Sequence, residues 1–291
     1  ICWVLARSFS RPISKIQKAA SKLGDGDLSY RISDVKSSGE IGMLANSFNA
    51  MAEKLENTAN SQNRLIADVS HELRTPMTRL QMALGLAQQN KNKEEALSKH
   101  LNRCEAEVEK LDSMVGDVLS LSRLENALYQ LNLEPISLKD LLSQLVSDLN
   151  FLTEEKLIKI KTSIEKEHVI DVDVSLISSA INNVLTNAIK YSPAQSIINI
   201  KVITNDELVH IEISDQGHGV PPDAIDKMFE PFYRVTDDRN RKTGGTGLGL
   251  AIAKQATSAH QGSIKAVNKK GGLTIIISLP IHLTKKEVTF S

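Results

Sequence analysis

The sequence has few aromatic residues, only two cysteines and no excess of charge of either sign. Aromatic residues make up 4% of 291 residues, which is low for a sheet-rich protein but natural for a chain rich in helical coiled coil. The 35 basic and 35 acidic residues cancel, which argues against binding nucleic acid by bulk electrostatics. Cys2 and Cys104 lack the spacing of metal ligands, so a reducing, cytoplasmic setting is expected.

The sequence also lacks an apolar run long enough for a complete membrane span. It opens with ICWVLARSFSRP rather than with Met, and apolar residues precede Arg7 and Arg11. This pattern predicts the end of a transmembrane helix over residues 1–6, with Trp3 at the interface and the arginines on the cytoplasmic side. The alternative is the frayed start of an amphipathic helix.

The length allows two or three domains, and the first is marked by apolar residues that recur every three or four positions. Two short helices show this spacing: Ile13, Ile16, Ala20 and Leu23, then Ile41, Leu44, Phe48, Met51 and Leu55. A polar connector of about 17 residues, GDGDLSYRISDVKSSGE, would let them run parallel and form a compact coiled-coil module in a dimer. An ordinary helical hairpin is the alternative.

The same spacing continues in two longer helices. It passes through Leu65, Val69 and Leu73, and the most regular run is Leu97, Leu101, Cys104, Val108, Leu111, Val115 and Val118. A short polar turn near residues 90–95 would join the helices into an antiparallel hairpin. Because one hairpin buries a single stripe, two chains are expected to pair into a four-helix bundle.

The period changes from about Pro135 onward. Six runs predict strands: KIKTSI, VIDVDV, IINIKVI, LVHIEIS, GSIKAV and LTIIISL. Helices are predicted between them, at residues 138–157, 175–191 and 248–261. The pattern indicates an α/β sandwich, a sheet covered by helices on one face, with its boundary near residues 126–133.

An exposed histidine is predicted on the first bundle helix, in the stretch SHELRTP. His71 is rotated about 200° from the core-facing Val69, so it should point at solvent. Thr75 lies one turn later on the same face. Pro76 cannot donate a hydrogen bond to the carbonyl of Glu72, so the helix should bend there and leave a free acceptor.

A neutral imidazole is a competent nucleophile near pH 7. Glu72 would accept the proton of the other ring nitrogen, and Thr75 would position water for the reverse, hydrolytic reaction. The other six histidines lack this context and are expected to be solvated surface residues: His100, His168, His210, His218, His260 and His282.

The helix predicted at residues 175–191 carries a polar stripe of Asn183, Asn187, Lys190 and Tyr191. Amide oxygens suit Mg²⁺ that carries triphosphate oxygens, and Lys190 supplies positive charge to the phosphates. This stripe is interpreted as one wall of a nucleotide pocket, in place of an ordinary polar helix face.

Two glycine-rich stretches would complete the pocket. DQGHG begins with Asp215, a carboxylate at a strand end that would accept a hydrogen bond from an adenine amino group. After a short helix predicted at residues 221–234 and a charged lid, VTDDRNRKTGG, the stretch GTGLGLAI leaves amides free at a helix N-terminus to meet phosphate. It is neither the Walker sequence nor the dinucleotide fingerprint. Together with the exposed histidine, the pocket predicts phosphoryl transfer from a nucleotide to His71.

At these residues the chain resembles the sensor histidine kinases of two-component signalling, in particular their envelope-stress branch. SHELRTP resembles the phosphoacceptor box, and INNVLTNAIKYS, DQGHG, FEPFYR and GGTGLGLAI resemble the four boxes of the ATP-binding domain of Bergerat type. The resemblance implies six segments: membrane-helix end 1–6, HAMP linker 7–58, dimerisation and histidine phosphotransfer domain 59–126, linker 127–135, catalytic domain 136–284 and tail 285–291.

The resemblance also implies roles for single residues. His71 would be phosphorylated, Asn187 would bind Mg²⁺ and Asp215 would read adenine, while Thr75 would support phosphatase activity. The ATP site would comprise Asn183, Asn187, Lys190, Tyr191, Asp215, Gly217, Gly219, Phe232, Arg234, Gly245, Thr246, Gly247, Leu248 and Gly249. Gln216 and His218 depart from the small residues common in the family, and little effect is expected from them.

The implied partners are a second copy of the chain and a response regulator with an OmpR-like receiver, at the cytoplasmic face of a bacterial inner membrane. Two alternatives remain. Gyrase-type or Hsp90-type ATPases share the pocket, but they carry a Glu, which activates water, where this chain has Asn183. A non-catalytic coiled-coil scaffold is the other alternative.

Overall fold

The computed structural model describes residues 10–33, 39–90, 93–125, 130–166, 168–205, 207–235, 245–269 and 271–282. The predicted membrane-helix end, the centre of the predicted lid at residues 236–244 and the predicted tail lie outside them. The chain forms two compact units, residues 1–71 and residues 72–291.

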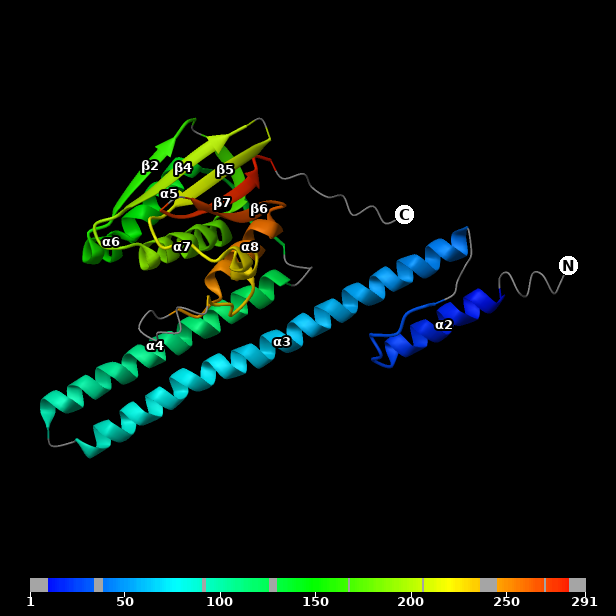
Figure 1. Ribbon diagram of the computed structural model, residues 1–291, viewed down its shortest axis with the longest axis horizontal. Helices are drawn as coiled ribbons and strands as arrows, with labels where there is room; N and C mark the ends of the chain where they lie inside the picture. Colours follow the sequence, from blue (N-terminus) through cyan, green and yellow to red (C-terminus); the bar gives the residue numbers. More distant parts are fainter. Residues whose placement is uncertain are drawn as a thin grey trace. The chain divides into compact units, whose positions relative to one another are not determined.

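The first unit contains α2 (Arg11–Gly24) and the beginning of α3 (Glu40–Gln89), and Figure 1 shows the two helices running in the same direction, as predicted. Pro12 stands at the start of α2, where its missing N–H costs no helical hydrogen bond. A small core joins the helices and consists of Ala19, Ile32, Ala45, Phe48 and Ala52. Leu44, Met51 and Leu55, which belong to the predicted stripe, are exposed in the single chain.

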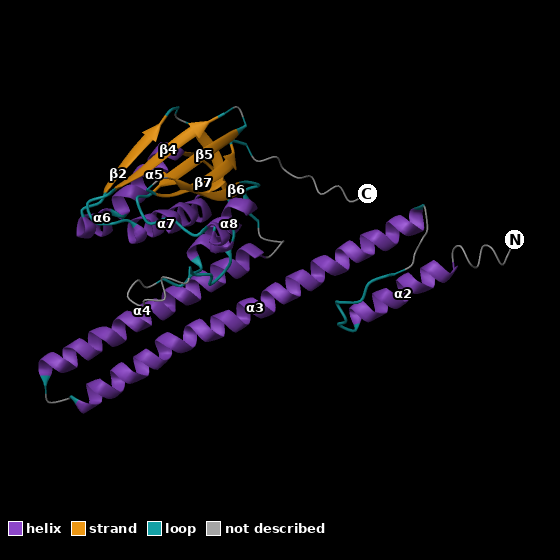
Figure 2. Cartoon of the chain, in the orientation of Figure 1, coloured by secondary structure: helices purple, strands orange, loops and turns teal. Residues whose placement is uncertain are grey.

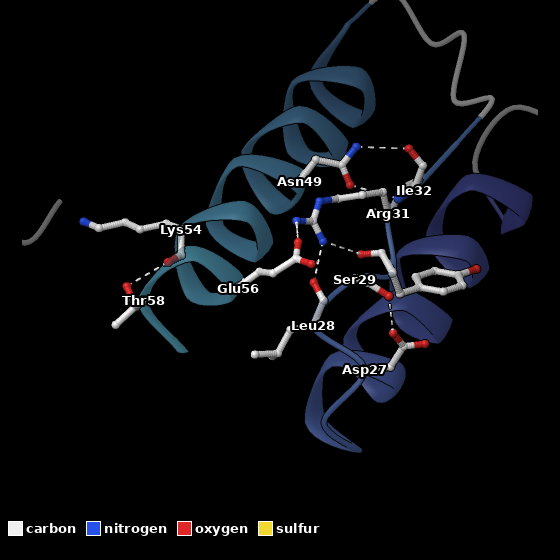
Figure 3. Close-up of polar contacts among 10 residues, drawn as sticks. Asp27, Leu28, Ser29, Arg31, Ile32, Asn49, Lys54, Glu56 and Thr58 are labelled. Atoms are coloured by element: carbon white, nitrogen blue, oxygen red, sulfur yellow. Dashed lines mark hydrogen bonds and ion pairs between the residues drawn. The ribbon is translucent and has the colours of Figure 1, made fainter. Parts of the chain in front are cut away.

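The connector is clamped to α3 by two polar contacts (Figure 3). The side-chain amide of Asn49 pairs with the backbone of Ile32 in both directions, accepting from its N–H at 2.9 Å and donating to its carbonyl at 3.0 Å. The guanidinium of Arg31 pairs with the carboxylate of Glu56 at 2.5 Å. The two bonds of Asn49 satisfy backbone groups of Ile32 that would otherwise lack partners in irregular chain.

The helix α3 is a single element of 50 residues. It continues through residue 58, where two separate helices were predicted to meet, and through Pro76. In the second unit α3 is followed by α4 (Glu94–Glu125), and Arg79 pairs with Glu107 across the two helices at 3.7 Å.

The rest of the second unit is the predicted α/β sandwich, and Figure 2 shows its strands and helices as separate layers. The five-stranded sheet has the order β2-β4-β5-β7-β6, in which β2 and β4 are parallel and the other pairs antiparallel. Its strands are β2 (Lys159–Ile164), β4 (Ile197–Thr204), β5 (Leu208–Ser214), β6 (Ser263–Lys269) and β7 (Gly272–Pro280). The helices are α5 (Leu138–Asp148), α6 (Asn150–Lys156), α7 (Val174–Tyr191) and α8 (Gly249–Ala259).

The core lies between one face of the sheet and these helices, as predicted. The apolar face of α7, with Ile177, Ile181 and Leu185 fully buried, belongs to the same core as the inward side chains of the sheet. Burial of this many aliphatic side chains is the main force that holds α7 in place.

Several predicted elements were wrong in detail. The strand β1 (Leu133–Ser137) was not predicted, and among the described residues it pairs with β3 (Val169–Asp173), so Pro135 stands in a two-stranded sheet that tolerates it. The helix predicted at residues 138–157 is interrupted at Leu149. The segment predicted as one short helix contains two 3₁₀ turns, η2 (Pro222–Ala224) and η3 (Lys227–Phe229).

The prediction for His260 was also wrong. Its side chain is fully buried at the end of α8, where it bridges backbone groups of two helices. A period-based interpretation treats a histidine at a helix end as polar surface, whereas the packing of α8 against α7 encloses this one.

Candidate functional site

A cavity of about 490 Å³ lies between α7, the turn after β5, the glycine-rich loop before α8, and α4. Most of the predicted nucleotide-site residues line it together: Asn183, Asn187, Lys190, Tyr191, Asp215, Gly217, Gly219, Arg234, Gly245, Thr246, Gly247 and Gly249. They come from three stretches that are far apart in the sequence. The fold therefore brings the predicted polar groups together around one cavity.

The helix α7 presents its polar stripe from a firmly anchored position. The carboxylate of Asp173 caps its start by accepting the N–H of Leu176 at 3.2 Å. At its end the ammonium of Lys156 donates to the carbonyls of Ile189 and Lys190 at 2.9 and 2.7 Å, and to that of Ser192 at 3.4 Å. A cation at these carbonyls also complements the helix dipole.

Asp215 ends β5 and organises the turn that follows it. Its Oδ1 accepts hydrogen bonds from the N–H groups of Gly217 at 2.8 Å and Leu273 at 3.2 Å. In the part of the chain that is described, Oδ2 has no hydrogen-bond partner. The carboxylate is thus oriented by one oxygen, and the other remains able to accept from a ligand.

The glycine-rich loop approaches α7 too closely for side chains. A Cβ on Gly245 would lie 2.8 Å from Nζ of Lys190, and one on Gly249 would lie 2.9 Å from Oδ1 of Asn183. Gly247 adopts a φ of +76°, a left-handed conformation that glycine adopts without strain. The loop therefore brings its backbone next to the polar stripe of α7.

Two predicted site residues support the loop from outside the cavity lining. The N–H of Phe232 donates to the carbonyl of Gly247 at 2.9 Å, and Leu248 is fully buried. Their contribution to the site is to hold the loop.

The predicted phosphoacceptor group lies on α3. His71 and Thr75 are exposed, Glu72 is half-buried and Pro76 is buried. The exposure of His71 agrees with the prediction from helical periodicity.

The cavity residues that were not predicted from the sequence include Lys110, Ser113, Asp117 and His218. The first three come from α4, for which only the apolar positions of the coiled coil were considered in the sequence. The ring of His218 packs edge-on against that of Tyr191, with centroids 6.1 Å apart.

Asp117 contacts the glycine-rich loop directly. Its carboxylate accepts a hydrogen bond from the hydroxyl of Thr246 at 3.0 Å. Burial raises the pKa of Asp117, and the hydrogen bond from Thr246 partly offsets the rise.

The donor set of the cavity suits a hard cation that a ligand brings with it. Among the described residues no group of three or more histidine, cysteine or acidic side chains forms a metal site. Mg²⁺ keeps several waters and substrate oxygens and needs few protein ligands, so the amide oxygen of Asn187 is a fitting protein ligand.

Three family models match the chain in succession. The HAMP domain matches residues 4–57, the His Kinase A (phospho-acceptor) domain matches residues 61–127, and the histidine kinase-, DNA gyrase B- and HSP90-like ATPase matches residues 172–283.

The chain is similar to several named histidine kinases. Sensor histidine kinase CpxA of Escherichia coli K12 is 34% identical over 282 residues, which cover 96% of this chain and 60% of CpxA. The structure of full-length ShkA in complex with AMPPNP is 30% identical and has a TM-score of 0.57, covering 76% of this chain and 46% of ShkA. Histidine kinase ThkA in complex with the response regulator TrrA has a TM-score of 0.64 at 22% identity, covering 78% and 66%.

The chain belongs to the sensor histidine kinases of two-component systems, and it is of the CpxA type. It spans about 60% of the length of the CpxA sequence that it matches. Among the described helices none is both long and apolar enough to cross a membrane.

Proposed function

We propose that this chain binds ATP with Mg²⁺ in the cavity and transfers the γ-phosphoryl group to His71. The observation that carries the proposal is Asn183, whose amide lies against the first residue of α8. An amide cannot act as a general base, so it does not activate water as the Glu of the related ATPases would. The γ-phosphoryl group is therefore kept for another nucleophile.

Different residues of the cavity would bind different parts of the nucleotide. Oδ2 of Asp215 would accept from the adenine amino group, and the loop from Gly245 to Gly249 would present N–H groups to the phosphates. Lys190 and Arg234 supply positive charge, and Asn187 would hold Mg²⁺, which neutralises phosphate charge when bound. Catalysis of this kind depends mostly on positioning and on charge neutralisation.

The transfer itself would take place at the exposed imidazole. A ring nitrogen of His71 forms the new N–P bond as the bond from the γ-phosphorus to the β–γ bridging oxygen breaks, and ADP leaves with that electron pair. Glu72 would accept the proton from the other ring nitrogen. The catalytic part would reach His71 by rotating about the predicted linker 127–135. The last residues of that linker belong to β1.

The phosphoryl group would then pass to an aspartate of a response regulator with an OmpR-like receiver, and Thr75 would support the reverse, phosphatase reaction. The solved complex of ThkA with TrrA supports a regulator as partner, since ThkA shares the fold of this chain. The regulator would dock on the helical bundle. We also propose the segment boundaries 7–58, 59–126 and 136–284.

A homodimer would complete the bundle. Leu101, Val108 and Val115 follow one another at intervals of seven residues on α4 and are 49, 51 and 47% exposed in the single chain. A second copy would cover this stripe, as coiled-coil packing requires. The module at residues 7–58 would bias two packings of the bundle and so pass on a signal from membrane helices upstream, at the inner membrane.

The test is incubation of the chain with γ-labelled ATP and Mg²⁺. Label on the protein should be lost in acid and survive alkali, as for phosphohistidine. His71→Ala and Asn187→Ala should both abolish labelling, and His282→Ala, which changes an exposed histidine outside the site, should retain it. Acid-stable label, or label that persists without His71, would contradict the proposal.

A further inference from the structure

The bundle helix α4 places an acidic side chain in the wall of the nucleotide cavity. Asp117 lines the cavity, and its carboxylate accepts a hydrogen bond from the hydroxyl of Thr246 at 3.0 Å. The same hydroxyl oxygen accepts the N–H of Leu248 at 3.3 Å. Asp117 is thus connected through one hydroxyl to the backbone amide just ahead of α8.

This connection uses donors that suit an anion. Loops at helix N-termini bind phosphate through backbone N–H groups and short hydroxyl side chains. Here the hydroxyl of Thr246 is directed to the protein's own carboxylate, and the N–H of Leu248 is directed to that hydroxyl. A carboxylate from α4 therefore stands where the oxygens of a polyphosphate would compete for the same donors.

The position of Asp117 is held by apolar packing on both sides. Met114, three residues before it, and Leu121, four residues after it, are 1% and 0% exposed. This spacing places all three on one face of α4, the helix that lies against α8. Asp117 therefore lies between two buried apolar residues on one face of α4, and its carboxylate contacts the loop ahead of α8.

The electrostatics of this interface oppose a bound triphosphate. Burial removes water from the carboxylate of Asp117 and raises its pKa, so its charge is poorly solvated. Like charges brought together across such an interface repel strongly. The cavity is also lined by the cationic residues Lys110, Lys190 and Arg234. Without the carboxylate of Asp117, they would attract the phosphates unopposed.

We propose that Asp117 sets the affinity for ATP by occupying the glycine-rich loop as an internal anion, so that bound polyphosphate and the docking of α4 on α8 oppose each other. The inference rests on the proposed ATP site and adds a residue to it. Because the coupling is reciprocal, docking weakens ATP binding by the same factor by which ATP weakens docking. ATP would then release the catalytic part from α4.

The first experiment measures the affinity of the whole chain for AMPPNP with Mg²⁺ by calorimetry. Asp117→Asn keeps an acceptor for the hydroxyl of Thr246 and removes the charge, so the dissociation constant should fall about tenfold, equivalent to about 1.4 kcal/mol. The control, Asp112→Asn, makes the same charge change on an exposed residue of α4 and should leave the affinity unchanged.

Adenosine separates the phosphate effect from a general change of the pocket. Asp117→Asn should leave the affinity for adenosine unaltered, because adenosine has no phosphate. An unchanged affinity for AMPPNP, or an equal shift for adenosine and AMPPNP, would overturn the inference. A wild-type chain that bound neither ligand would instead contradict the proposed ATP site itself.

A second measurement needs no variant. Hydrogen exchange of the wild-type amides over residues 110–121 should accelerate when AMPPNP and Mg²⁺ are added, because α4 loses its cover. Unchanged or slower exchange in this segment, under conditions where calorimetry shows binding, would refute the antagonism.

Discussion

The ring of His260 joins the end of α8 to the start of α7: its Nε2 accepts the N–H of Asp173 at 2.9 Å, and its Nδ1 donates to the carbonyl of Ala256 at 2.7 Å. Only the neutral ring satisfies both groups, since a protonated ring has no acceptor nitrogen. The bridge therefore links the helix of the polar stripe to the helix of the glycine-rich loop through one uncharged imidazole.

The first prediction is that this bridge makes stability depend on pH. Burial lowers the pKa of His260, against smaller opposing effects of the Ala256 carbonyl and Asp173. Below about pH 6.5 the His260 ring binds a proton in the unfolded state and stays neutral in the folded state. The stabilisation that the His260 bridge contributes is therefore complete above about pH 6.5, and it declines as the pH falls towards the lowered pKa of His260.

Urea unfolding between pH 5 and pH 8 checks this prediction. His260→Gln should lower the free energy of unfolding by about 1–3 kcal/mol at pH 7.5 and flatten its dependence on pH. His282→Gln, a change at an exposed histidine, should leave the slope unaltered. An equal slope in wild type and His260→Gln would exclude the bridge as its source.

The second prediction concerns the ammonium of Lys156 at the end of α7. Lys156→Met removes its three hydrogen bonds to carbonyls, so it should destabilise the chain by about 1–2 kcal/mol. Because Lys190 lies in that last turn, the KM for ATP should rise several-fold with a smaller change in kcat. The matched variant Lys159→Met, at an exposed lysine of β2, should change neither quantity. An unaltered KM would show that the cap supports the fold alone.

The third prediction separates the geometry of the loop from its stability. In Gly249→Ala the new methyl group would lie 2.9 Å from Oδ1 of Asn183, so the amide must move and nucleotide affinity should fall by about tenfold or more. The melting temperature should change little, because alanine favours a helix start. Gly85→Ala, on α3 with open space around it, should bind AMPPNP like the wild type. Full affinity in Gly249→Ala would contradict the close approach.

The fourth prediction addresses the exposed stripe of α4. Val108→Asp places a charge in the middle of the proposed dimer face and should shift the chain from dimer to monomer in sedimentation at micromolar concentration. Asn102→Asp introduces the same charge at an exposed position off the stripe and should remain dimeric. A Val108→Asp chain that sediments like wild type would place the dimer face elsewhere.

The fifth prediction concerns the clamp on the connector of the first unit. Asn49→Ala leaves both backbone groups of Ile32 without their partner, which should cost about 1–3 kcal/mol locally. Hydrogen exchange at the Ile32 amide should accelerate accordingly. Thr58→Ala, which removes a bond made only within α3, should not affect that amide. Slow exchange at Ile32 in Asn49→Ala would show that other contacts hold the connector.

Much of the fold follows from local pattern. The period of two located six of the seven strands of the sandwich within two residues, and the period of three to four located α4, α7 and α8. The failures have particular causes. The run at residues 133–137 has too little apolar character to read as a strand, and it becomes one only because β3 pairs with it. Nothing periodic marks the interruption at Leu149.

The candidate site shows the same division. The polar stripe of α7, the carboxylate after β5 and the glycine-rich loop were predicted because each is a local arrangement with its own chemistry. Three residues of α4 were missed, namely Lys110, Ser113 and Asp117. Their spacing is also that of a solvated helix face, and only the packing of α4 on α8 places them in the cavity.

The sequence by itself indicated the candidate nucleophile, the candidate amide ligand and the candidate phosphate-binding loop, because such roles depend on side-chain chemistry and on spacing along one element. Tertiary structure alone decided that His260 is enclosed and neutral and that an aspartate of the bundle reaches the phosphate loop. Burial and charge proximity depend on which surfaces pack together, and contacts between residues 87 and 129 positions apart leave no local pattern to detect.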